Sequence, residues 1–410
     1  MVVAGLVNRL AREKVSMLFQ KYICIDWRQF AKQATLRKFN MRLQTSARIH
    51  LDHLRFNFHQ IQRAIAPARL IPVVKADAYG HGAVRVSNCL VDEGAQLLAV
   101  AQFQEAMALR DSGIHVPILI FGRLFPEELP DAIRAGFRLT VFGEEDIRWI
   151  EKAAGNRPAH VHVNMETGMG RVGVLPAQEQ TVVDMLTRSS HCVWEGVYSH
   201  FATSDETDKT YAHLQLNCFQ AILRRLKANS QIPPMVHMAN SGAILDMPET
   251  RFAACRCGIM LYGHYPSKDT GRSIPLKQVM RLTTRIAHLR RLPTGHNVSY
   301  GRRWQTDRET TIAVLPIGYA DGLRRHLTGQ LQVMIGTRRY PVVGTITMDQ
   351  IMVDVGDDPV NVGDEVLIWG DTENGSIQVI DVAEAMGSIP YELTCGISRR
   401  VPRVVVDEEK

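Results

Sequence analysis

From residue 47 onwards, short apolar runs rich in Val, Ile and Leu alternate with longer amphipathic segments. Apolar runs of this kind predict buried strands, and apolar residues at helical spacing predict helices between them. Eight runs fit the strand pattern: 70–75, 96–101, 117–122, 138–142, 160–164, 194–200, 235–240 and 257–263. Eight strands that alternate with helices over some 230 residues are typical of a (β/α)8 barrel.

The clearest helical pattern lies at 205–228, where apolar residues recur at helical spacing. Thr203, followed by Glu206 three residues later, fits a capping box and predicts that the helix begins there.

The pattern changes after about residue 276. Strand-like runs such as "TIAVLPIGYA" and "DEVLIWG" then follow one another with turns between them, and only 376–387 has a helical pattern. The sequence therefore predicts an α/β fold: an N-terminal (β/α)8 TIM-type barrel over 47–276, followed by a C-terminal mostly-β domain over 277–410.

Composition excludes some classes of protein. Apolar residues make up 45% and charged residues 22% of the chain, as in ordinary globular proteins. No apolar run approaches the ~18 residues of a membrane span, so we expect no membrane partner. The seven cysteines form no CxxC pair, which is typical of reduced thiols and predicts a cytoplasmic enzyme.

The net charge of +6 is concentrated at the N-terminus. Residues 1–46 hold nine basic and two acidic residues, a net charge of +7, so the other 364 residues carry a net charge of −1. A neutral body argues against a nucleic-acid partner. The acid-poor segment 1–46 could be a targeting peptide. We expect instead a poorly ordered basic extension, or an upstream start with Met41 as the true first residue.

Polar residues gather where the predicted barrel strands end, which is where barrel enzymes place their active sites. Lys75 ends the first run, in "VVKADAYGHG". The residues after the later strands are Asn164, Arg171, His200, Asn240, Ser241, Arg256, Gly258 and Ile259. The loops after strands seven and eight commonly bind phosphate in barrels, and Ser241 with the backbone amides near Gly258 suits that role. A lysine across the barrel mouth from a phosphate site suggests pyridoxal phosphate (PLP), whose aldehyde forms a Schiff base with a lysine amine.

Each of these residues also has a purely structural explanation. Lys75 could be a surface lysine, His200 a core histidine, Ser241 a helix cap, Arg256 an ion-pair residue and Tyr300 a packing residue. Their joint placement at one end of one barrel favours the catalytic interpretation.

The chain resembles the alanine racemase family over nearly all of residues 47–406. Motifs of eight or more residues, in the family's order, carry the resemblance: "VVKADAYGHGA" (73–83), "ETGMGRVG" (166–173), "YSHFATSDE" (198–206), "HMANSGAIL" (237–245), "RCGIMLYG" (256–263), "LPIGYADGL" (315–323) and "ITMDQIMVD" (346–354), with the shorter "VSYGRRW" at 298–304.

The resemblance implies a PLP enzyme that acts as a homodimer and interconverts L- and D-alanine, supplying D-alanine for peptidoglycan. Lys75 would be the cofactor-binding lysine and the base for the D-enantiomer, and Tyr300 of the partner subunit would be the opposing base. The other implied contacts are Arg256 to the pyridine nitrogen; Tyr79, Ser241, Gly258 and Ile259 to the phosphate; His200 near the ring; and Arg171 with the backbone of Met348 to the substrate carboxylate.

Two positions differ from the family's commonest pattern. Asn164 stands where many members have a lysine, often carbamylated, that bonds the arginine matching Arg171. An asparagine cannot supply that negative charge, so a bound anion would have to hold Arg171 instead. Arg399 replaces a frequent tyrosine near the phosphate and the site entrance, which leaves the substrate range open.

Three alternatives remain. The nearest is a related racemase acting on serine or basic amino acids. Related PLP decarboxylases typically place an acid against the pyridine nitrogen, so Arg256 argues against them. Non-catalytic PLP-carrying barrels lack a C-terminal β domain, so residues 277–406 argue against that class.

Overall fold

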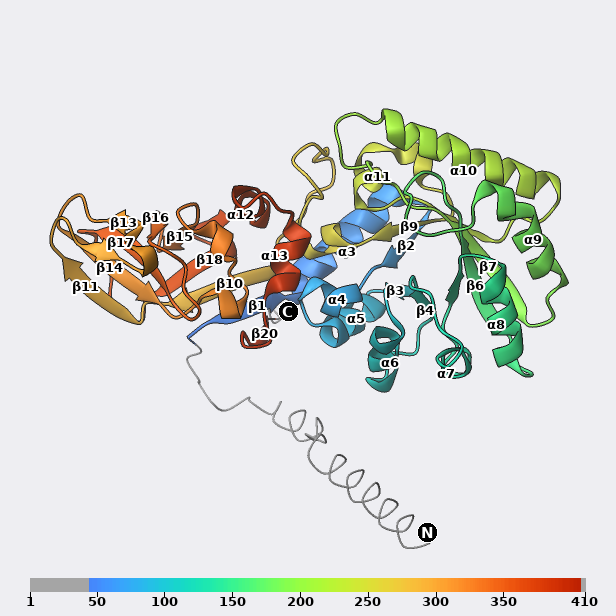
Figure 1. Ribbon diagram of the computed structural model, residues 1–410, viewed down its shortest axis with the longest axis horizontal. Helices are drawn as coiled ribbons and strands as arrows, with labels where there is room; N and C mark the ends of the chain where they lie inside the picture. Colours follow the sequence, from blue (N-terminus) through green and yellow to red (C-terminus); the bar gives the residue numbers. More distant parts are fainter. Residues whose placement is uncertain (1–43, 407–410) are drawn as a thin grey trace, which may run out of the picture. The chain divides into compact units, whose positions relative to one another are not determined.

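The computed structural model describes residues 44–406 (Figure 1). The basic segment predicted over 1–46 therefore lies outside the described residues, except for its last three positions.

Eight parallel strands form a closed barrel. Six pair in the order β2-β9-β8-β7-β6-β5, and β3 pairs with β4. Bridges between Val73 and Ala99 and between Leu119 and Arg138 join the two groups and close the ring. The strands are β2 (Arg69–Pro72), β3 (Leu98–Val100), β4 (Ile118–Ile120), β5 (Leu139–Val141), β6 (Ala159–Asn164), β7 (Cys192–Tyr198), β8 (Met235–His237) and β9 (Ala254–Cys257). The predicted barrel is confirmed.

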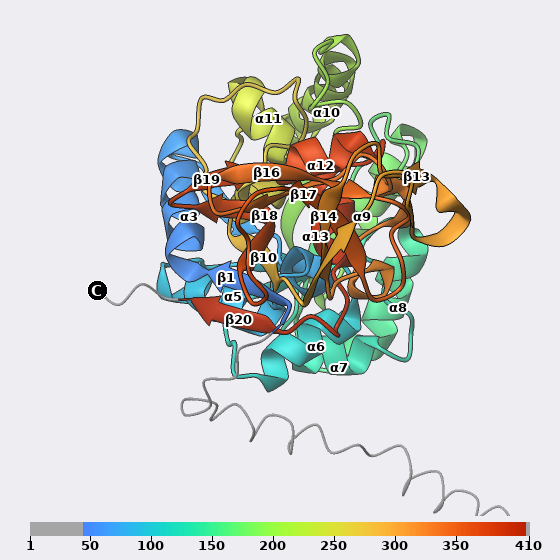
Figure 2. The same ribbon diagram turned by 90° about the vertical axis from the view of Figure 1, so that its left-hand side faces the viewer.

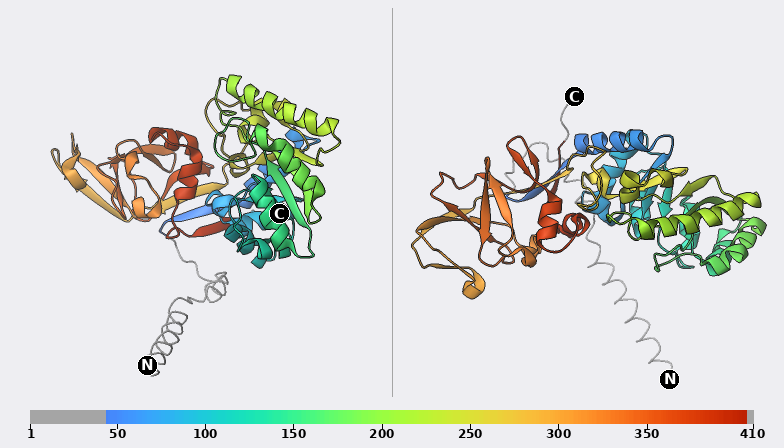
Figure 3. Two further views of the ribbon diagram at one scale, coloured as in Figure 1. Left: turned by 45° about the vertical axis from the view of Figure 1, so that its right-hand side comes forward. Right: turned by 90° about the horizontal axis from the view of Figure 1, so that it is seen from above.

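Helices surround these strands because each buries one apolar face against them; further views show them on the outside of the ring (Figure 3). They are α3 (Leu51–Ile65), α5 (Ala83–Asp92), α6 (Phe103–Asp111), α7 (Leu129–Arg134), α8 (Glu144–Ala154), α9 (Glu179–Arg188), α10 (Thr210–Ala228) and α11 (Ser241–Asp246). The short segment α4 (Lys75–Tyr79), which follows β2, is instead a left-handed turn.

The capping box predicted at Thr203 is wrong, because α10 begins only at Thr210. The preceding residues are tied to the barrel rim instead. The buried Ser204 hydroxyl donates to Asn240 Oδ1 at 2.7 Å, and the Lys209 amine donates to the Ser204 carbonyl oxygen at 2.8 Å. The Lys209 amine also lies 3.2 Å from Asp246 Oδ2. The contacts with Asn240 and Asp246 tie the loop 203–209 to the two ends of α11 (Ser241–Asp246).

The last predicted barrel strand also differs from expectation. The run 257–263 contains the end of β9 and a short 3₁₀ helix, η3 (Ile259–Tyr262). An apolar run alone cannot separate a buried strand from a buried helical turn. Gly258 lies at the junction, between the end of β9 and the start of η3.

The C-terminal residues form a largely antiparallel sheet in the order β11-β14-β17-β16-β15-β18-β10-β1-β20, with β19 paired to β18 (Figure 2). Its strands are β1 (Ser46–His50), β10 (Met280–Arg285), β11 (His288–Leu292), β14 (Thr310–Leu315), β15 (Gln332–Ile335), β16 (Arg338–Val343), β17 (Ile351–Gly356), β18 (Glu365–Thr372), β19 (Gly375–Ile377) and β20 (Arg403–Val406). A small hairpin pairs β12 (Asn297–Val298) with β13 (Trp304–Gln305). The predicted mostly-β region is confirmed. Residues 46–50, however, pair with β10 and β20 in this sheet and not with the barrel strands.

Two helices accompany this sheet. α12 (Val379–Ala385) lies within the segment predicted to be helical, whereas α13 (Pro390–Gly396) was not predicted. α13 contacts α4 at Gly80, where a Cβ would lie only 2.1 Å from the Thr394 carbonyl oxygen. Gly80 also has φ of +82°, so only glycine suits this contact. The contact brings α13 to the turn that carries Lys75.

None of the described helices combines the length and the apolar character that crossing a membrane requires.

Candidate active site

A cavity of about 580 Å³ opens at the C-terminal ends of the barrel strands. Four cationic residues line it, Lys75, Arg123, Arg171 and Arg256, while no Asp or Glu side chain is among its lining residues. A concave site with cations and no carboxylates attracts anionic ligands. The cavity brings together ten residues named in the sequence analysis: Lys75, Tyr79, Asn164, Arg171, His200, Asn240, Ser241, Arg256, Gly258 and Ile259.

Lys75 begins a left-handed turn. Ala76, Asp77, Ala78 and Tyr79 all have φ of +53°, a conformation that costs roughly 1–2 kcal/mol per non-glycine residue. Local bonds hold the turn: the Ala76 N–H donates to Glu105 Oε1 at 2.6 Å, and the Ala83 N–H donates to Asp77 Oδ1 at 2.7 Å. Backbone strain of this kind, held by its surroundings, is common at functional sites.

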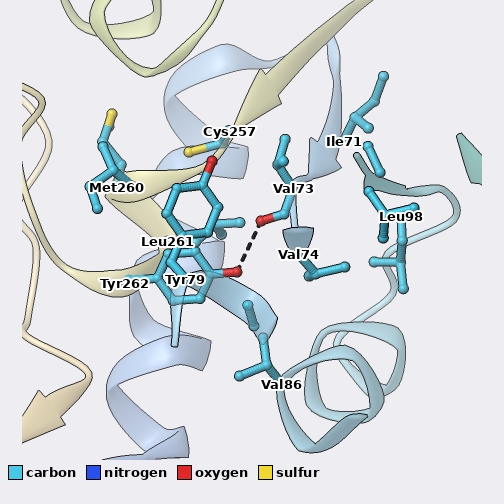
Figure 4. Close-up of a cluster of buried hydrophobic side chains, with 14 of the residues drawn as sticks. Ile71, Val73, Val74, Tyr79, Val86, Leu98, Cys257, Met260, Leu261 and Tyr262 are labelled. Atoms are coloured by element: carbon cyan, nitrogen blue, oxygen red, sulfur yellow. Dashed lines mark hydrogen bonds between the residues drawn. The ribbon is translucent and has the colours of Figure 1, made fainter. Parts of the chain in front are cut away.

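The turn also places the Tyr79 ring in the core beside Tyr262 (Figure 4). The two ring centroids are 4.9 Å apart. The Tyr262 hydroxyl donates to the Val73 carbonyl oxygen at 2.9 Å, which ties η3 to the chain just before Lys75.

The Lys75 amine makes no hydrogen bond or ion pair with any described residue. Burial lowers the pKa of Lys75, and the nearby Arg171 charge lowers it further. Both effects favour the neutral amine, which is the form that can act as a nucleophile or as a base.

α11 and η3 both begin at the cavity, where Ser241, Gly258 and Ile259 are among the lining residues. Ser241 is the first residue of α11, and the Asn240 side chain caps this helix by accepting from the Ala243 N–H. The Gly258 N–H donates to Ser241 Oγ at 3.3 Å. The first N–H groups of a helix have no intrahelical acceptor, so this end of the cavity suits an anion.

Arg256 lies buried at the end of β9. Its Nη1 donates to His237 Nδ1 at 2.8 Å, and its Nη2 donates to the Ser199 carbonyl oxygen at 2.7 Å. Its Nη2 also lies 3.1 Å from His200 Nδ1. Burial lowers the pKa of Arg256 to about 10, so the guanidinium stays charged at neutral pH and only donates hydrogen bonds.

The two histidines that contact Arg256 are neutral. Burial lowers the pKa of His200 and of His237 well below 6.5, and the Arg256 charge adds to the effect. Their Nδ1 atoms can therefore accept from the guanidinium.

Arg171 lies in the loop after β6. The Glu166 carboxylate accepts from three backbone N–H groups of this loop, those of Gly168, Gly170 and Arg171. The Arg171 side chain is exposed and pairs with no carboxylate of the described residues. Asn164 lies at the base of this loop, where a Cβ on Gly173 would be 2.7 Å from Asn164 Oδ1.

Tyr300 and Met348 do not line the cavity. Tyr300 is 73% exposed and Met348 is 51% exposed. They belong to neighbouring loops of the C-terminal sheet, because the Thr345 hydroxyl donates to the Tyr300 carbonyl oxygen at 2.8 Å. Arg399 is also exposed, and it is not a lining residue.

Sequence reasoning missed several lining residues, among them Tyr198 and Tyr391. Tyr198 stacks on His237 at 4.8 Å and lies under the Arg256 guanidinium at 5.1 Å. Its position two residues before His200 could have revealed it, because alternate residues of an extended chain share a face. Tyr391 lies on α13, the helix that was not predicted, and no sequence signal linked it to the barrel.

Comparisons with known proteins agree with this architecture. Residues 49–266 match the family model "Alanine racemase, N-terminal domain", and residues 279–405 match "Alanine racemase, C-terminal domain". The chain is 43% identical to alanine racemase 1 of Clostridium acetobutylicum over 366 residues, covering 88% of this chain and 95% of that protein. It is 40% identical to the alanine racemase of Treponema denticola, covering 89% and 98% of the two chains.

Solved structures give the same result. The alanine racemase of Clostridium difficile 630 superposes with a TM-score of 0.85 at 37% identity, covering 90% of this chain and 97% of that one. The alanine racemase of Bacillus anthracis with bound L-Ala-P superposes with a TM-score of 0.83 at 35% identity, covering 90% and 96%. Both sequence and structure therefore show that this chain belongs to the alanine racemase family, a family of isomerases.

Proposed function

We propose that this protein is a PLP-dependent racemase that interconverts L- and D-alanine. The observation that carries the proposal is the unpaired Lys75 amine, which lines the same cavity as the anion-binding end formed by α11 and η3. Family membership supports the reaction, and the cavity supports the cofactor.

The residues present fit PLP. At the phosphate end, Ser241 and the backbone of Gly258 and Ile259 would hold the anion, together with the Tyr79 hydroxyl, which has no hydrogen-bond partner among the described residues. A Cβ on Gly258 would fill this space, because it would lie 2.3 Å from Tyr79 Oη. His200 would pack near the ring, and the Arg256 guanidinium would donate to the ring nitrogen.

When bound, PLP would supply an electron-withdrawing ring that acidifies the Cα–H bond of the amino acid. Arg256 limits how strong this withdrawal becomes. A guanidinium cannot readily give up a proton, so the ring nitrogen facing it would remain unprotonated. A weaker electron sink disfavours side reactions such as transamination, which suits a racemase.

Racemisation requires one proton acceptor on each face of the reacting carbon. We assign the D-face to Lys75, whose pKa is lowered by burial and by Arg171; the neutral amine can accept the Cα proton and the ammonium can return it. The tyrosines of the same cavity are poorly suited to the other face, because burial raises the pKa of Tyr79, Tyr198 and Tyr391.

We assign the second face to Tyr300 of the partner subunit. In its own chain this side chain is exposed and outside the cavity, which suits a residue that completes a neighbouring site. A symmetric homodimer would then contain two sites, each built from both chains. Met348, which is also exposed and follows Thr345, the residue bonded to the Tyr300 carbonyl oxygen, would contribute its backbone N–H to the substrate carboxylate in the same way.

Arg171 would bind the substrate carboxylate from the barrel side. The charge-assisted contact would orient the amino acid, and the Glu166 carboxylate fixes the loop that carries Arg171. The resulting D-alanine would serve peptidoglycan synthesis. We place the enzyme in the cytoplasm, where thiols such as those of the six free cysteines among the described residues stay reduced.

The test is a substrate panel. The purified holoenzyme is incubated separately with L-alanine, L-serine, L-lysine and L-arginine, and the D-enantiomer is measured by chiral chromatography. L-Alanine should give the highest kcat/KM, with serine as the secondary substrate, and Lys75→Ala should be inactive with all four. A higher kcat/KM for serine, lysine or arginine would show that the alanine assignment is wrong.

A further inference from the structure

Arg256 is a buried cation, and no carboxylate of residues 44–406 contacts it. Its hydrogen-bond partners are the carbonyl oxygens of Ser199, His237 and Met238 and the Nδ1 atoms of His200 and His237. All are uncharged. A buried charge is costly unless another charge or a well-ordered polar network compensates it.

A chain of polar contacts leads from Arg256 through the barrel interior. His237 Nε2 lies 2.9 Å from His162 Nδ1, and His162 Nε2 lies 3.5 Å from Glu195 Oε2. The last distance is at the outer limit of a hydrogen bond. His162 Nε2 is nevertheless fully buried and has no other polar partner, so the carboxylate is the group it faces.

Only one arrangement of protons satisfies this chain. Arg256 only donates, so His237 Nδ1 must accept, and its proton lies on Nε2. His237 Nε2 then donates to His162 Nδ1, which puts the His162 proton on Nε2, facing Glu195. In the opposite arrangement a His237 Nδ1–H would face an Arg256 N–H, donor against donor.

Glu195 is held as an anion at the far end. Arg138 contacts it twice, with Nε to Oε2 at 2.8 Å and Nη2 to Oε1 at 3.0 Å. Burial would raise the pKa of Glu195, but His162 and Arg138 outweigh burial and lower it to about 2. His160 is the remaining titratable group facing it, with Nδ1 3.8 Å from Oε1. Glu195 and Arg138 also line a second cavity, of about 630 Å³, away from the active site.

We propose that Glu195 is a positioning residue that acts on Arg256 through His162 and His237. Its carboxylate accepts the buried His162 N–H, fixes the proton positions of both imidazoles and thereby keeps His237 Nδ1 free to accept from Arg256. The proposal rests on the proposed function, because Arg256 matters for catalysis only where it faces a cofactor ring.

Three variants test this role. Glu195→Leu removes the acceptor. The double variant Arg138→Leu with Glu195→Leu removes both charges. It replaces the single variant if Glu195→Leu does not fold because Arg138 is left unpaired, since exchanging both members of an ion pair for apolar residues is often tolerated. The matched control is Arg138→Gln, which breaks the same ion pair but keeps the carboxylate.

The first readout is independent of activity: ¹⁵N NMR of histidine-labelled apoenzyme reports which ring nitrogen of each imidazole carries the proton. The wild type and Arg138→Gln should show His162 and His237 protonated at Nε2 alone. Glu195→Leu and the double variant should show a mixture of protonation sites. Wild-type proton positions in both Leu variants, or a mixture in Arg138→Gln, would overturn the proposal.

The second readout is kinetic. In the Leu variants kcat should fall by about tenfold, the smaller of the losses typical when a residue that orients a functional group is removed. The KM for alanine and the affinity for PLP should stay within about twofold of the wild-type values. Unchanged kcat in the Leu variants would contradict the role. A failure of the proposed function would give a different result. The wild-type enzyme would make no D-alanine, although the NMR spectra would still show His162 and His237 protonated at Nε2.

Discussion

The absence of a side chain at Gly258 makes room for the hydroxyl of Tyr79. A Cβ on Gly258 would lie 2.3 Å from Tyr79 Oη and 2.9 Å from the ring carbon that bears it. The ring cannot easily retreat, because it packs against Tyr262 at 4.9 Å and Tyr391 at 5.8 Å. Gly258 and Tyr79 therefore form one closely fitted unit at the end of the cavity that we propose for the phosphate.

Gly258→Ala should weaken the binding of PLP to the apoenzyme by at least about tenfold, because losing a hydrogen bond to a charged group costs roughly 1.5–3 kcal/mol. The dissociation constant can be measured by titrating PLP and following the absorbance of the bound cofactor. The control is Gly143→Ala, since Gly143 has open space around its Cβ position and no positive φ in the disfavoured range. Equal affinities for the two variants would contradict the fit between Gly258 and Tyr79.

A second prediction concerns the amine of Lys75. In the apoenzyme, trace labelling with an acetylating reagent across a pH series should give Lys75 a lower midpoint than the exposed Lys268, whose carboxylate partners Glu384 and Asp381 raise its pKa. Burial and Arg171 lower the pKa of Lys75, so Arg171→Met should move the midpoint of Lys75 upwards. Peptide mass spectrometry identifies the labelled lysine.

Arg123→Met provides the matched control for Lys75. It removes another cation that lines the cavity, but one that pairs with Glu145 and Asp146 and is not among the main causes of the lowered pKa of Lys75. An equal displacement of the Lys75 midpoint by both variants would mean that Arg171 has no specific effect.

In the holoenzyme, borohydride reduction followed by peptide mapping should recover the cofactor on Lys75. Recovery on another lysine would refute the role of Lys75.

A third prediction concerns stability at acid pH. His81 is fully buried and donates from Nδ1 to the carbonyl oxygens of Ala78 and Tyr79, at 3.0 and 2.9 Å, which holds the left-handed turn. Burial lowers the pKa of His81 to about 4. Between pH 6.5 and about 4 the unfolded chain therefore binds a proton at this position that the folded chain does not, so the stability contributed by neutral His81 is lost as the pH falls through this window.

His81→Asn, whose amide can donate to the same carbonyl groups, should flatten the pH dependence of the unfolding free energy by up to about 1.4 kcal/mol per pH unit. Denaturant titrations of apoenzyme at several pH values measure the slope. At pH 7 and above, the difference in the free energy of unfolding between the variant and the wild type should not change with pH. A slope in the variant equal to that of the wild type would show that His81 titrates normally in the folded protein.

The barrel could be predicted from sequence because its strands are buried on both faces. Their apolar runs stand out against polar loops. Seven of the eight predicted runs hold all or most of a barrel strand, and the run 257–263 overlaps only the last residue of β9. The start of α10 could not be predicted, because the Ser204 hydroxyl bonds Asn240, a partner 36 residues away, in place of its own helix. α13 was missed for a similar reason: its apolar residues are few, and its contact with Gly80 is made across more than 300 residues of sequence.

The site residues at the strand ends could be predicted from the sequence, whereas the residues behind them in the barrel could not. Lys75, Ser241 and Arg256 follow directly from strand ends, because parallel strands bring these ends to one rim. The chain through His237, His162 and Glu195 was not predicted. His162 and Glu195 lie in the middle of β6 and β7, away from the strand ends, and only His237 ends its strand, β8. A hydrogen-bonded path of that kind depends on which strands are neighbours, and that order appears only in the folded barrel.

The last prediction concerns the two bases and the dimer together. Lys75→Ala and Tyr300→Phe should each be nearly inactive, the first without its cofactor lysine and the second without its L-face proton acceptor, although Tyr300→Phe should still bind PLP. If each site takes Lys75 from one chain and Tyr300 from the other, a heterodimer of the two variants has one doubly damaged site and one intact site. Activity should then return on subunit exchange, to about half of wild type per heterodimer. Differently tagged chains verify the exchange, and Lys75→Ala mixed with Lys75→Ala is the matched control. Verified exchange without returning activity would mean that both bases come from one chain, and the exposed Tyr300 would then need another role.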